Sequence, residues 1–294
     1  MRFSVLIATK GRPSALERTL ESLSRCDPPP DELVVADGDE QRSAETVSAE
    51  FSGRGSLPAV SYLAAPPGLT RQRNHAIARA GGDVLVFLDD DVLVDPRFLA
   101  ELAGAYRDED VVGATGRVRE QGARRFGGSR SPIRRFLFGR GREGTMTRFG
   151  YPRRIQGVDE ERDVEFMQGC LMSGRREAVE QVGFDESLAG YALCEDEDFS
   201  YRLSRIGRVR YLPAAVVKHE NTGFRTSASR DFNRQLMINR AYLFRKNFEQ
   251  TPLSRLQFAG LLLPVLVAHR AVNRDWQGIR GLLEGARAAW RGRR

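Results

Sequence analysis

The sequence predicts an α/β protein with a mixed, mostly parallel, Rossmann-like sheet flanked by helices, followed by a helical C-terminal tail. Over the first 115 residues, short apolar runs alternate with amphipathic helical patterns, in the rhythm of β-α-β units. The run 84–88 is apolar throughout and lies between glycines and carboxylates, which is typical of a parallel strand buried on both faces. Beyond residue 222 the patterns are helical.

The length and composition suit one large α/β domain with an appendage, since the chain has 294 residues of which 41% are hydrophobic. The three cysteines, Cys26, Cys170 and Cys194, are far apart and form no C-x-x-C pair, so neither a zinc site nor a disulfide framework is expected. The first expected strand begins at residue 3 with no signal-peptide pattern before it. We therefore expect a cytoplasmic protein.

The positive charge of the chain is concentrated in one region. A net charge of +7 and a pI of about 9.7 favour an anionic partner, such as nucleic acid, a phospholipid surface or a phosphorylated substrate. Residues 117–162 contain thirteen arginines and five acids, a local excess of eight. Glycines and aromatic residues are mixed with these arginines, so the stretch is expected to be a long, partly mobile excursion from the sheet.

The first β-α unit carries cations at a strand end. Residues 3–8 are the expected strand, and Arg12-Pro13-Ser14 begins a helix with leucines at positions 16, 20 and 23. The loop that starts at Thr9 places Lys10 and Arg12 at the carboxyl end of the strand, where ligands bind in open α/β sheets. An anionic ligand and a solvated basic loop explain these cations equally well.

Two further strands end close to polar residues. Strand 33–36 is followed by Asp37-Gly38-Asp39, which alone is a common turn signal. Strand 60–64 precedes a helix that begins near Thr70 and has Arg71 and Arg73 in its first turn. Cations at this position oppose the helix dipole unless an anion binds there. The pattern favours an anion-binding role for the two arginines over a structural one.

The three aspartates Asp89, Asp90 and Asp91 follow strand 84–88 directly. Three adjacent carboxylates repel one another unless positive charge lies among them. In a tight turn, Asp89 and Asp91 can point the same way and hold a hard divalent cation together with waters and substrate phosphates. A solvated acidic turn is the alternative. We expect Asp95-Pro96 to begin the next helix, and the chain has no G-x-x-x-x-G-K-[ST] loop to pair with a Walker B strand.

The second half of the chain is expected to complete the sheet with strands at 111–115, 164–173, 209–212 and 215–218. Between them, Glu195-Asp196-Glu197-Asp198 begins a helix. Acids are favourable there, but four exceed what capping requires. His219 follows the last strand, and a lone histidine at such a place is more often structural than a ligand.

The C-terminal region combines an apolar run with a basic amphipathic helix. Residues 256–268 are almost wholly apolar, but 13 residues fall short of the ~20 that span a bilayer. The last helix places Trp276, Leu283 and Trp290 on one face, with arginines elsewhere. These features suit a helix lying in the interface of an anionic membrane, or packing onto the catalytic domain or a second subunit.

Five motifs, in their order and spacing, resemble those of the family 2 glycosyltransferases. They are Thr9-Lys10-Gly11-Arg12-Pro13, Asp37-Gly38, Gly68-Leu69-Thr70-Arg71-Gln72-Arg73-Asn74, Asp89-Asp90-Asp91 and Glu195-Asp196-Glu197-Asp198. The resemblance covers roughly residues 1–222 and implies a GT-A fold. It places a nucleotide-binding half at 1–115 and an acceptor half at 116–222, which includes the arginine-rich loop 117–162. Residues 223–294 are then a helical C-terminal extension.

The resemblance implies a metal-dependent, inverting glycosyltransferase. Such an enzyme moves one sugar from a nucleotide-sugar donor to a hydroxyl of a glycan or lipid-linked acceptor, in the synthesis of a cell-surface polysaccharide or glycolipid. Displacing a nucleoside diphosphate needs charge neutralisation, which a metal and arginines supply, and a base for the acceptor hydroxyl. The chain lacks the Q-x-x-R-W sequence of processive synthases, which favours transfer of one sugar per encounter.

Roles for individual residues also follow from the resemblance. Asp89 and Asp91 match the D-x-D pair that holds Mn²⁺ or Mg²⁺, and His219 matches a histidine that joins the metal or pyrophosphate shell in some members. Asp196 matches the general base. Residues expected at the donor are Thr9, Arg12, Asp37 at the nucleobase, Arg71, Arg73 and Asp90. Asp39 and Cys194 depart from the family pattern, in which serine and glycine are usual.

Two rival classes stay open at the level of sequence. A sugar-phosphate nucleotidyltransferase shares the acidic metal turn but normally begins with a glycine-rich phosphate loop. A basic nucleic-acid-binding protein would use residues 117–162 but would leave the ordered carboxylates unexplained, so no specific nucleic-acid partner is expected. An anionic membrane surface and a homodimer are the further partners that the sequence leaves open. The expected location is the cytoplasm or, peripherally, the inner face of the cell membrane.

Overall fold

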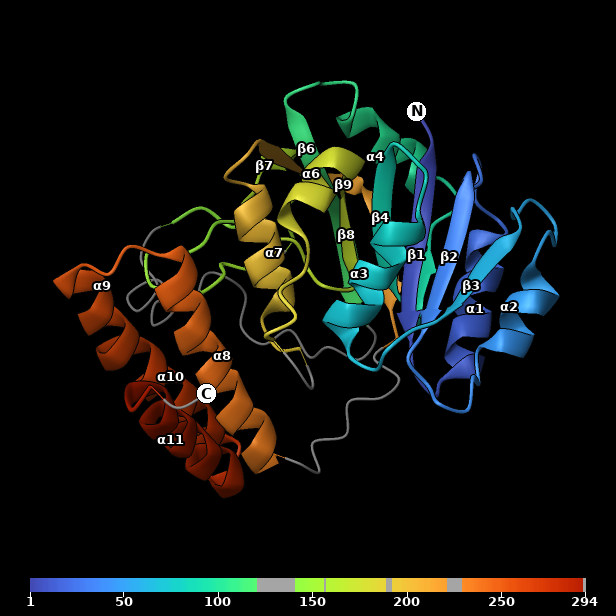
Figure 1. Cartoon of the computed structure of the whole chain (residues 1–294). Coiled ribbons are helices and arrows are strands. Elements are labelled where there is room, and N and C mark those ends of the chain that lie inside the picture. Colours follow the sequence, from blue (N-terminus) through green and yellow to red (C-terminus); the bar gives the residue numbers. More distant parts are fainter. Residues whose placement is uncertain (121–140, 156, 189–191, 221–228, 293–294) are drawn as a thin grey trace. The chain divides into compact units, whose positions relative to one another are not determined.

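The computed structural model describes residues 1–120, 141–155, 157–188, 192–220 and 229–292 (Figure 1). The chain forms two compact units. Unit 1 comprises Met1–Phe126 and Gly157–Thr222, and unit 2 comprises Gly127–Gln156 and Gly223–Arg294. Residues 121–140 and 156 of the arginine-rich stretch lie outside the described residues. The division into 1–115, 116–222 and 223–294 remains a proposal.

Unit 1 is built on a mixed sheet, which has nine strands in the described residues. Along the sheet the order is β3 (Val60–Ala64), β2 (Glu32–Asp37), β1 (Phe3–Thr9), β4 (Val84–Asp89), β8 (Leu171–Arg175), β6 (Val111–Glu120), β9 (Arg208–His219) and β5 (Val92–Val94), with β7 (Arg162–Asp163) paired to β9. β1 to β4 are parallel, whereas β8 runs antiparallel to both β4 and β6. The predicted Rossmann-like α/β class is confirmed.

Helices cover both faces of this sheet, as Figure 1 shows. Alternate residues of β1 and β4 pack with α1 (Pro13–Leu23), α2 (Glu45–Phe51) and α4 (Phe98–Ala105) in one large core. On the opposite face, near α3 (Leu69–Arg79), α6 (Arg176–Val182) and α7 (Glu195–Leu203), Phe87 makes edge contacts with Phe184 and Phe199. Residues 84–88 are at most 1% exposed, so the prediction of a strand buried on both faces is confirmed.

The chain after the aspartates differs from the prediction. Instead of a helix starting at Asp95-Pro96, residues 92–94 form β5, which pairs antiparallel with β9. The helix α4 begins at Phe98, with Arg97 at its N-cap position. The Asp95 carboxylate accepts a hydrogen bond from the Arg97 N–H at 3.1 Å, so it closes the turn before the helix. A three-residue strand is too short to show a periodicity in the sequence.

Two strand predictions in the second half are also corrected. The stretch 164–173 is not one strand, because β7 precedes it, β8 begins only at Leu171, and the residues between are irregular. Residues 209–212 and 215–218 belong to the single strand β9, which is bulged around Pro213. Proline has no N–H for the ladder, and the bulge faces Gly116, where a Cβ would lie 1.9 Å from the Ala215 carbonyl oxygen.

Unit 2 contains the predicted C-terminal helices. α8 (Ser229–Asn247) and α11 (Trp276–Trp290) lie against each other along a line of glycines. A Cβ at Gly281 would lie 2.1 Å from the Arg230 carbonyl oxygen, and one at Gly285 would lie 2.4 Å from that of Arg234. Only glycine permits this approach of the two backbones. The described residues 141–155 pack in the same unit, where Arg240 donates to the Gly150 carbonyl at 3.2 Å.

A continuous helix joins α8 to α11. It consists of α9 (Pro252–Gln257), a π-helical turn (Phe258–Leu262) and α10 (Leu263–Val272). The π-helical turn lies just before Pro264, which lacks the N–H that an α-helix requires there. The helix Pro252–Val272 has 21 residues, and by length and composition alone it is long and apolar enough to cross a membrane. The length argument from the 13-residue run is therefore corrected, because the helix extends beyond that run at both ends.

Candidate functional site

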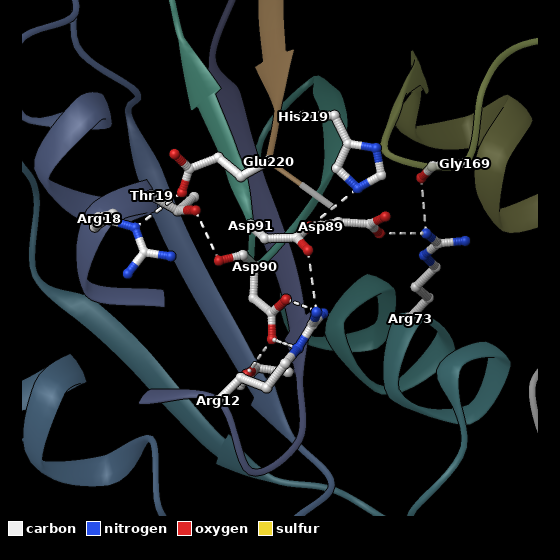
Figure 2. Close-up of polar contacts among 11 residues, drawn as sticks. Arg12, Arg18, Thr19, Arg73, Asp89, Asp90, Asp91, Gly169, His219 and Glu220 are labelled. Atoms are coloured by element: carbon white, nitrogen blue, oxygen red, sulfur yellow. Dashed lines mark hydrogen bonds and ion pairs between the residues drawn. The ribbon is translucent and has the colours of Figure 1, made fainter. Parts of the chain in front are cut away.

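The candidate site lies at the carboxyl ends of the parallel strands. The register pairs Thr9 of β1 with Asp37 of β2, and Ala8 with Asp89 of β4, so these strand ends meet at one edge of the sheet. In the pairing of β5 with β9, Val92 faces His219. Because Val92 directly follows Asp91, this pairing carries His219 to the aspartates. Figure 2 shows the resulting cluster.

Asp89, Asp91 and His219 form the candidate metal centre. One ligand atom from each residue lies within 4.8 Å of the other two. The His219 Nε2 atom is 3.1 Å from Asp91 Oδ1, and Asp89 is partly exposed. Two carboxylate oxygens and one imidazole nitrogen are donors that suit Mn²⁺, and the carboxylates suit Mg²⁺. The structure thus brings together the three residues predicted from the sequence to bind metal.

Asp90 points away from this centre and into the protein. Its carboxylate accepts hydrogen bonds from Thr9 Oγ1 at 2.7 Å and from Arg12 Nε at 3.1 Å, and its side chain is fully buried. Its backbone carbonyl accepts a bond from Thr19 Oγ1 at 2.8 Å. Burial raises the pKa of Asp90 to about 7, although Arg12 and Thr9 act in the opposite direction. The central aspartate therefore anchors the turn to β1 and α1.

Arg12 links two of the three aspartates. It makes a bidentate contact with the Asp90 carboxylate, and its Nη1 donates to Asp91 Oδ2 at 3.0 Å. The Asp91 carboxylate thus lies between Arg12 on one oxygen and His219 on the other. A fixed guanidinium fork at this place offsets the repulsion among the aspartates and sets the direction of Asp91.

Arg73 occupies the other side of the centre and is only 3% exposed. Its Nη2 donates to Asp89 Oδ1 at 3.1 Å and to the Gly169 carbonyl at 2.8 Å, as drawn in Figure 2. Its Nη1 donates to Glu195 Oε1 at 3.1 Å, and its guanidinium lies 5.1 Å from the centre of the Phe184 ring. One buried side chain therefore joins the aspartate turn to the start of α7.

The four acids at the start of α7 have different surroundings. Glu195, Glu197 and Asp198 are buried, with exposed fractions of 8%, 2% and 1%, whereas Asp196 is half-buried. Asp198 forms an ion pair with Arg202 at 2.6 Å, one turn along the helix. Burial, together with the charge of Asp196, raises the pKa of Glu195 to about 8. Asp196 is the acid of this group that a substrate can reach.

Asp196 is oriented by two backbone groups. Its Oδ2 accepts from the Gly169 N–H at 3.1 Å, and its Oδ1 accepts from the Glu197 N–H at 2.9 Å. A Cβ on Gly169 would lie 3.1 Å from Glu195 Oε1 and 3.3 Å from Asp196 Cβ. The glycine thus lets the segment before β8 approach α7 closely. This segment contacts Arg73 through the Gly169 carbonyl and Asp196 through the Gly169 N–H.

Asp37 is 1% exposed and closes the loop after β2. Its carboxylate accepts from the N–H groups of Asp39 at 2.9 Å and Ala44 at 3.0 Å, and from the Tyr62 hydroxyl at 3.1 Å. Burial and the Asp37 charge raise the pKa of Tyr62 to about 12. Through these contacts Asp37 holds the loop after β2, at the same edge of the sheet as Thr9, with which it is paired in the register of β1 and β2.

Arg71 lies apart from the cluster. Its side chain is about half exposed, and its Nε is 3.8 Å from Glu186 Oε2. The structure therefore brings Thr9, Arg12, Arg73, Asp90 and the three metal candidates into one network. Arg71 and Asp37 have partners outside that network, in Glu186 and in the loop after β2.

Two amides that the sequence did not single out tie the site together. Gln72, which is 4% exposed, donates from Nε2 to the carbonyls of Thr9 at 2.6 Å and Ala36 at 2.9 Å, bridging the ends of β1 and β2. Asn74 bonds to Phe184 through both its Nδ2 and its Oδ1, each at 2.9 Å. Their only sequence signal is their place in the motif from Gly68 to Asn74, because their partners are distant in the chain.

Solved structures with the same fold cover the whole chain. Residues 1–349 of Staphylococcus aureus TarS in complex with UDP-GlcNAc align with a TM-score of 0.59 and 16% identity, over 100% of this chain and 93% of that one. The mannosyltransferase PcManGT from Pyrobaculum calidifontis, in complex with GDP-Man and Mn²⁺, aligns with a TM-score of 0.61 and 15% identity, over 100% and 88%. The fold is that of the GT-A glycosyltransferases.

The family follows from the sequence comparisons. The model of glycosyl transferase family 2 matches residues 4–183. An uncharacterized glycosyltransferase of Bacillus subtilis (strain 168), YwdF, is 28% identical over 222 residues, which cover 74% of this chain and 73% of the relative. The chain belongs to glycosyl transferase family 2 and is a glycosyltransferase, as its motifs predicted.

Proposed function

We propose that the protein is a metal-dependent, inverting enzyme that moves one sugar from a nucleotide sugar to a hydroxyl of a glycan or lipid-linked acceptor. The observation that carries the proposal is the cluster of Asp89, Asp91 and His219, joined through Arg73 to the start of the helix that bears Asp196. The complexes of TarS with UDP-GlcNAc and of PcManGT with GDP-Man and Mn²⁺ support a nucleotide-sugar donor.

Asp89, Asp91 and His219 are the proposed holders of Mn²⁺ or Mg²⁺. The donor set fits such an ion, because carboxylate oxygens and an imidazole nitrogen lie close enough together to share it. The bound ion would neutralise charge on the departing nucleoside diphosphate. Arg12 serves this site by fixing Asp91 and by holding Asp90 out of it.

Asp196 is the proposed general base. It would take the proton of the acceptor hydroxyl while the hydroxyl oxygen bonds to the anomeric carbon and the bond from that carbon to the phosphate oxygen breaks. Attack on the face opposite the leaving group inverts the anomeric configuration. Asp196 fits this role because it is half-buried among buried acids and is held by the N–H groups of Gly169 and Glu197.

Arg73 is proposed as a positioning residue between donor and acceptor chemistry. It contacts Asp89 on the donor side, and Glu195 and Gly169 beside Asp196. A shift of Asp89 therefore changes the contacts that position the segment around Asp196. Thr9, Arg12, Asp37, Arg71 and Asp90 stay as proposed donor-site residues, Asp90 by anchoring the aspartate turn to Thr9 and Arg12 rather than by touching the donor. Of these, Arg71 is the exposed cation, and it is therefore the one best placed to reach a diphosphate without breaking buried contacts.

The proposed setting is the synthesis of a cell-surface polysaccharide or glycolipid in the cytoplasm or at the inner face of the membrane. An acceptor in or on a membrane would suit the basic and partly apolar C-terminal unit.

The proposal is tested by transfer assays with a panel of nucleotide sugars. Each donor is incubated with Mn²⁺ or with EDTA, and release of the nucleoside diphosphate is measured. We expect one donor to be turned over in a metal-dependent way, and NMR of the product to show an anomeric configuration opposite to that of the donor.

Asp91→Asn should lose this turnover. Asp83→Asn, at the amino end of the same strand and exposed, is the matched control and should keep it. Turnover that is equal in EDTA, or a product with retained configuration, would contradict the proposal.

A further inference from the structure

The helix Pro252–Val272 presents a continuous apolar stripe to solvent. Its exposed positions recur at helical spacing, and those on the stripe are Leu253, Leu256, Gly260, Pro264, Ala268 and Val272. Leu256 is 68% exposed and Val272 is 83% exposed. Only 6% of the most apolar 18-residue window of this helix is buried. An apolar stripe of this length in water indicates a missing partner.

The helix already uses its other side within unit 2. Ser254 and Leu262 are buried, at 1% and 0% exposed, and Phe258 stacks on Phe244 of α8 with ring centres 4.6 Å apart. The outward stripe is therefore not a failure of packing in this unit. It is a second apolar side on a helix whose first side is occupied.

The last helix shows the same division. α11 packs through small residues, since Gly278, Gly281 and Gly285 are buried. Leu282 is buried as well, whereas the two tryptophans of the helix point outward: Trp276 is 64% exposed and Trp290 is 87% exposed. Tryptophan has an apolar ring with one polar N–H, and it favours the boundary between water and the hydrocarbon of a bilayer.

The charge of this region complements an anionic surface. Residues 252–292 contain six arginines and two acids, a net charge of +4. The exposed arginines of this region are Arg255, Arg274, Arg280, Arg287 and Arg291. Each basic residue near a membrane that carries anionic lipid adds to binding. Apolar stripe, outward tryptophans and exposed arginines together form the signature of an interfacial element.

We propose that these exposed side chains, named here the tail surface (Leu253, Leu256, Val272, Trp276 and Trp290), bind the surface of a bilayer that contains anionic phospholipid. The helix Pro252–Val272 then lies in the plane of the interface. A spanning orientation is disfavoured, because the helix is packed against α8 through Phe244, and α8 carries several arginines that would enter the hydrocarbon with it. The inference rests on the proposed function only in that a membrane acceptor gives the binding its purpose.

The first test is flotation of the whole chain with vesicles. Neutral phosphatidylcholine vesicles are compared, at low and at high salt, with vesicles that also contain roughly 30% phosphatidylglycerol. The anionic headgroups of this lipid give the negative surface potential that attracts basic segments. We expect the chain to float with the anionic vesicles and less with the neutral ones. Absence from the anionic fraction at low salt would overturn the proposal.

Charge substitutions then locate the contact. Leu256→Glu and Val272→Glu introduce an acid at exposed positions, and each should weaken binding to the anionic vesicles about tenfold or more. Ile206→Glu is the matched control, because Ile206 is an exposed apolar residue of unit 1 at 42% exposed. Unchanged binding of the double variant would contradict the proposed surface.

Intrinsic fluorescence gives a readout that needs no variant. The chain has two tryptophans, Trp276 and Trp290, and both belong to the tail surface. Anionic vesicles should shift their emission to shorter wavelength, and brominated acyl chains should quench it. Vesicles that bind the chain without shifting or quenching this emission would place the contact elsewhere and overturn the proposal.

A second copy of the chain is the competing occupant. If light scattering shows a dimer that the Leu256→Glu and Val272→Glu double variant converts to a monomer, and vesicles do not bind, the tail surface is a subunit interface. Vesicle binding is measured without nucleotide sugar or acceptor, so a chain that does not bind vesicles refutes the membrane proposal but not the proposed sugar transfer. A chain that binds vesicles but transfers no sugar would refute the proposed function alone.

Discussion

The substitution Arg73→Lys tests whether one buried guanidinium holds the two halves of the site together. Arg73 reaches three acceptors with two nitrogens: Asp89 Oδ1, the Gly169 carbonyl and Glu195 Oε1, at 3.1, 2.8 and 3.1 Å. Lysine keeps the positive charge but offers a single nitrogen on a flexible stem, so it cannot reproduce the fork. At least one charge-assisted hydrogen bond is lost, and such a bond contributes about 1.5–3 kcal/mol.

We therefore expect Arg73→Lys to lower the free energy of unfolding by about 2 kcal/mol. Arg73→Met removes the charge as well, and it leaves the Asp89 carboxylate without its cation and the buried Glu195 carboxyl group without its donor. Breaking a buried ion pair from one side costs about 3–5 kcal/mol, so this variant should be the less stable of the two. Against a typical total of about 5–15 kcal/mol, Arg73→Met approaches the limit of folding.

The assay is urea unfolding followed by far-ultraviolet circular dichroism, because both tryptophans lie in unit 2 and their fluorescence does not report on Arg73. The matched controls are Arg71→Lys and Arg71→Met, two residues earlier on the same helix. Arg71 is about half exposed and 3.8 Å from its acidic neighbour, so its variants should stay within about 0.5 kcal/mol of the unmodified chain. If the Arg73 and Arg71 variants have equal free energies of unfolding, Arg73 does not hold the two halves of the site together.

Three further substitutions have defined outcomes. Glu195→Gln keeps an acceptor for Arg73 but cannot ionise. In the unmodified chain, burial raises the pKa of Glu195 from 4.5 to about 8, so the unmodified chain loses stability as pH rises through that window. The melting temperature of Glu195→Gln relative to the unmodified chain should thus increase from pH 5 to pH 8.5 in EDTA, and a constant difference would contradict the assignment. Arg12→Lys loses the bidentate contact with Asp90 and should weaken Mn²⁺ binding roughly tenfold by calorimetry, whereas unchanged binding would show that Asp91 needs no support from Arg12. Asp196→Asn should lower turnover by about 100-fold or more with donor affinity unchanged, and turnover that survives would exclude Asp196 as the base.

The strand ends of the site could be predicted because they are local features of the sequence. The run 84–88 is apolar and sharply bounded, and the aspartates after it could be placed at the edge of a parallel sheet without knowledge of distant contacts. The arginines of α3 were likewise recognisable, because a cation in the first turn of a helix needs an anion. For Arg73 the structure supplies protein carboxyl groups, those of Asp89 and Glu195, 16 and 122 residues away in the chain.

Features that depend on long-range register could not be predicted from local patterns, and His219 was expected at the metal only through the family resemblance. His219 reaches Asp91 only because the three-residue strand β5 pairs with the end of β9, and neither partner carries a pattern that sets this register. The burial of Asp90 depends on the pairing of β1 with β4, which brings Thr9 and the loop residue Arg12 to it from about 80 residues earlier in the chain. The length of Pro252–Val272 was missed because the polar residues Ser254 and Arg255 before the apolar run, and His269 and Arg270 after it, continue the helix.

The most direct test of a metal-dependent nucleotide-sugar enzyme is a calorimetric titration of UDP and of GDP into the chain with Mn²⁺ and with EDTA. The unmodified chain is compared with Asp91→Asn, which replaces a carboxylate of the candidate centre by an amide, and with Asp83→Asn directly before β4. We expect one of the two diphosphates to bind at least about tenfold more tightly with Mn²⁺, a gain of about 1.4 kcal/mol. The gain should persist in Asp83→Asn and disappear in Asp91→Asn. Equal affinities in Mn²⁺ and EDTA, or a gain that survives in Asp91→Asn, would contradict the account.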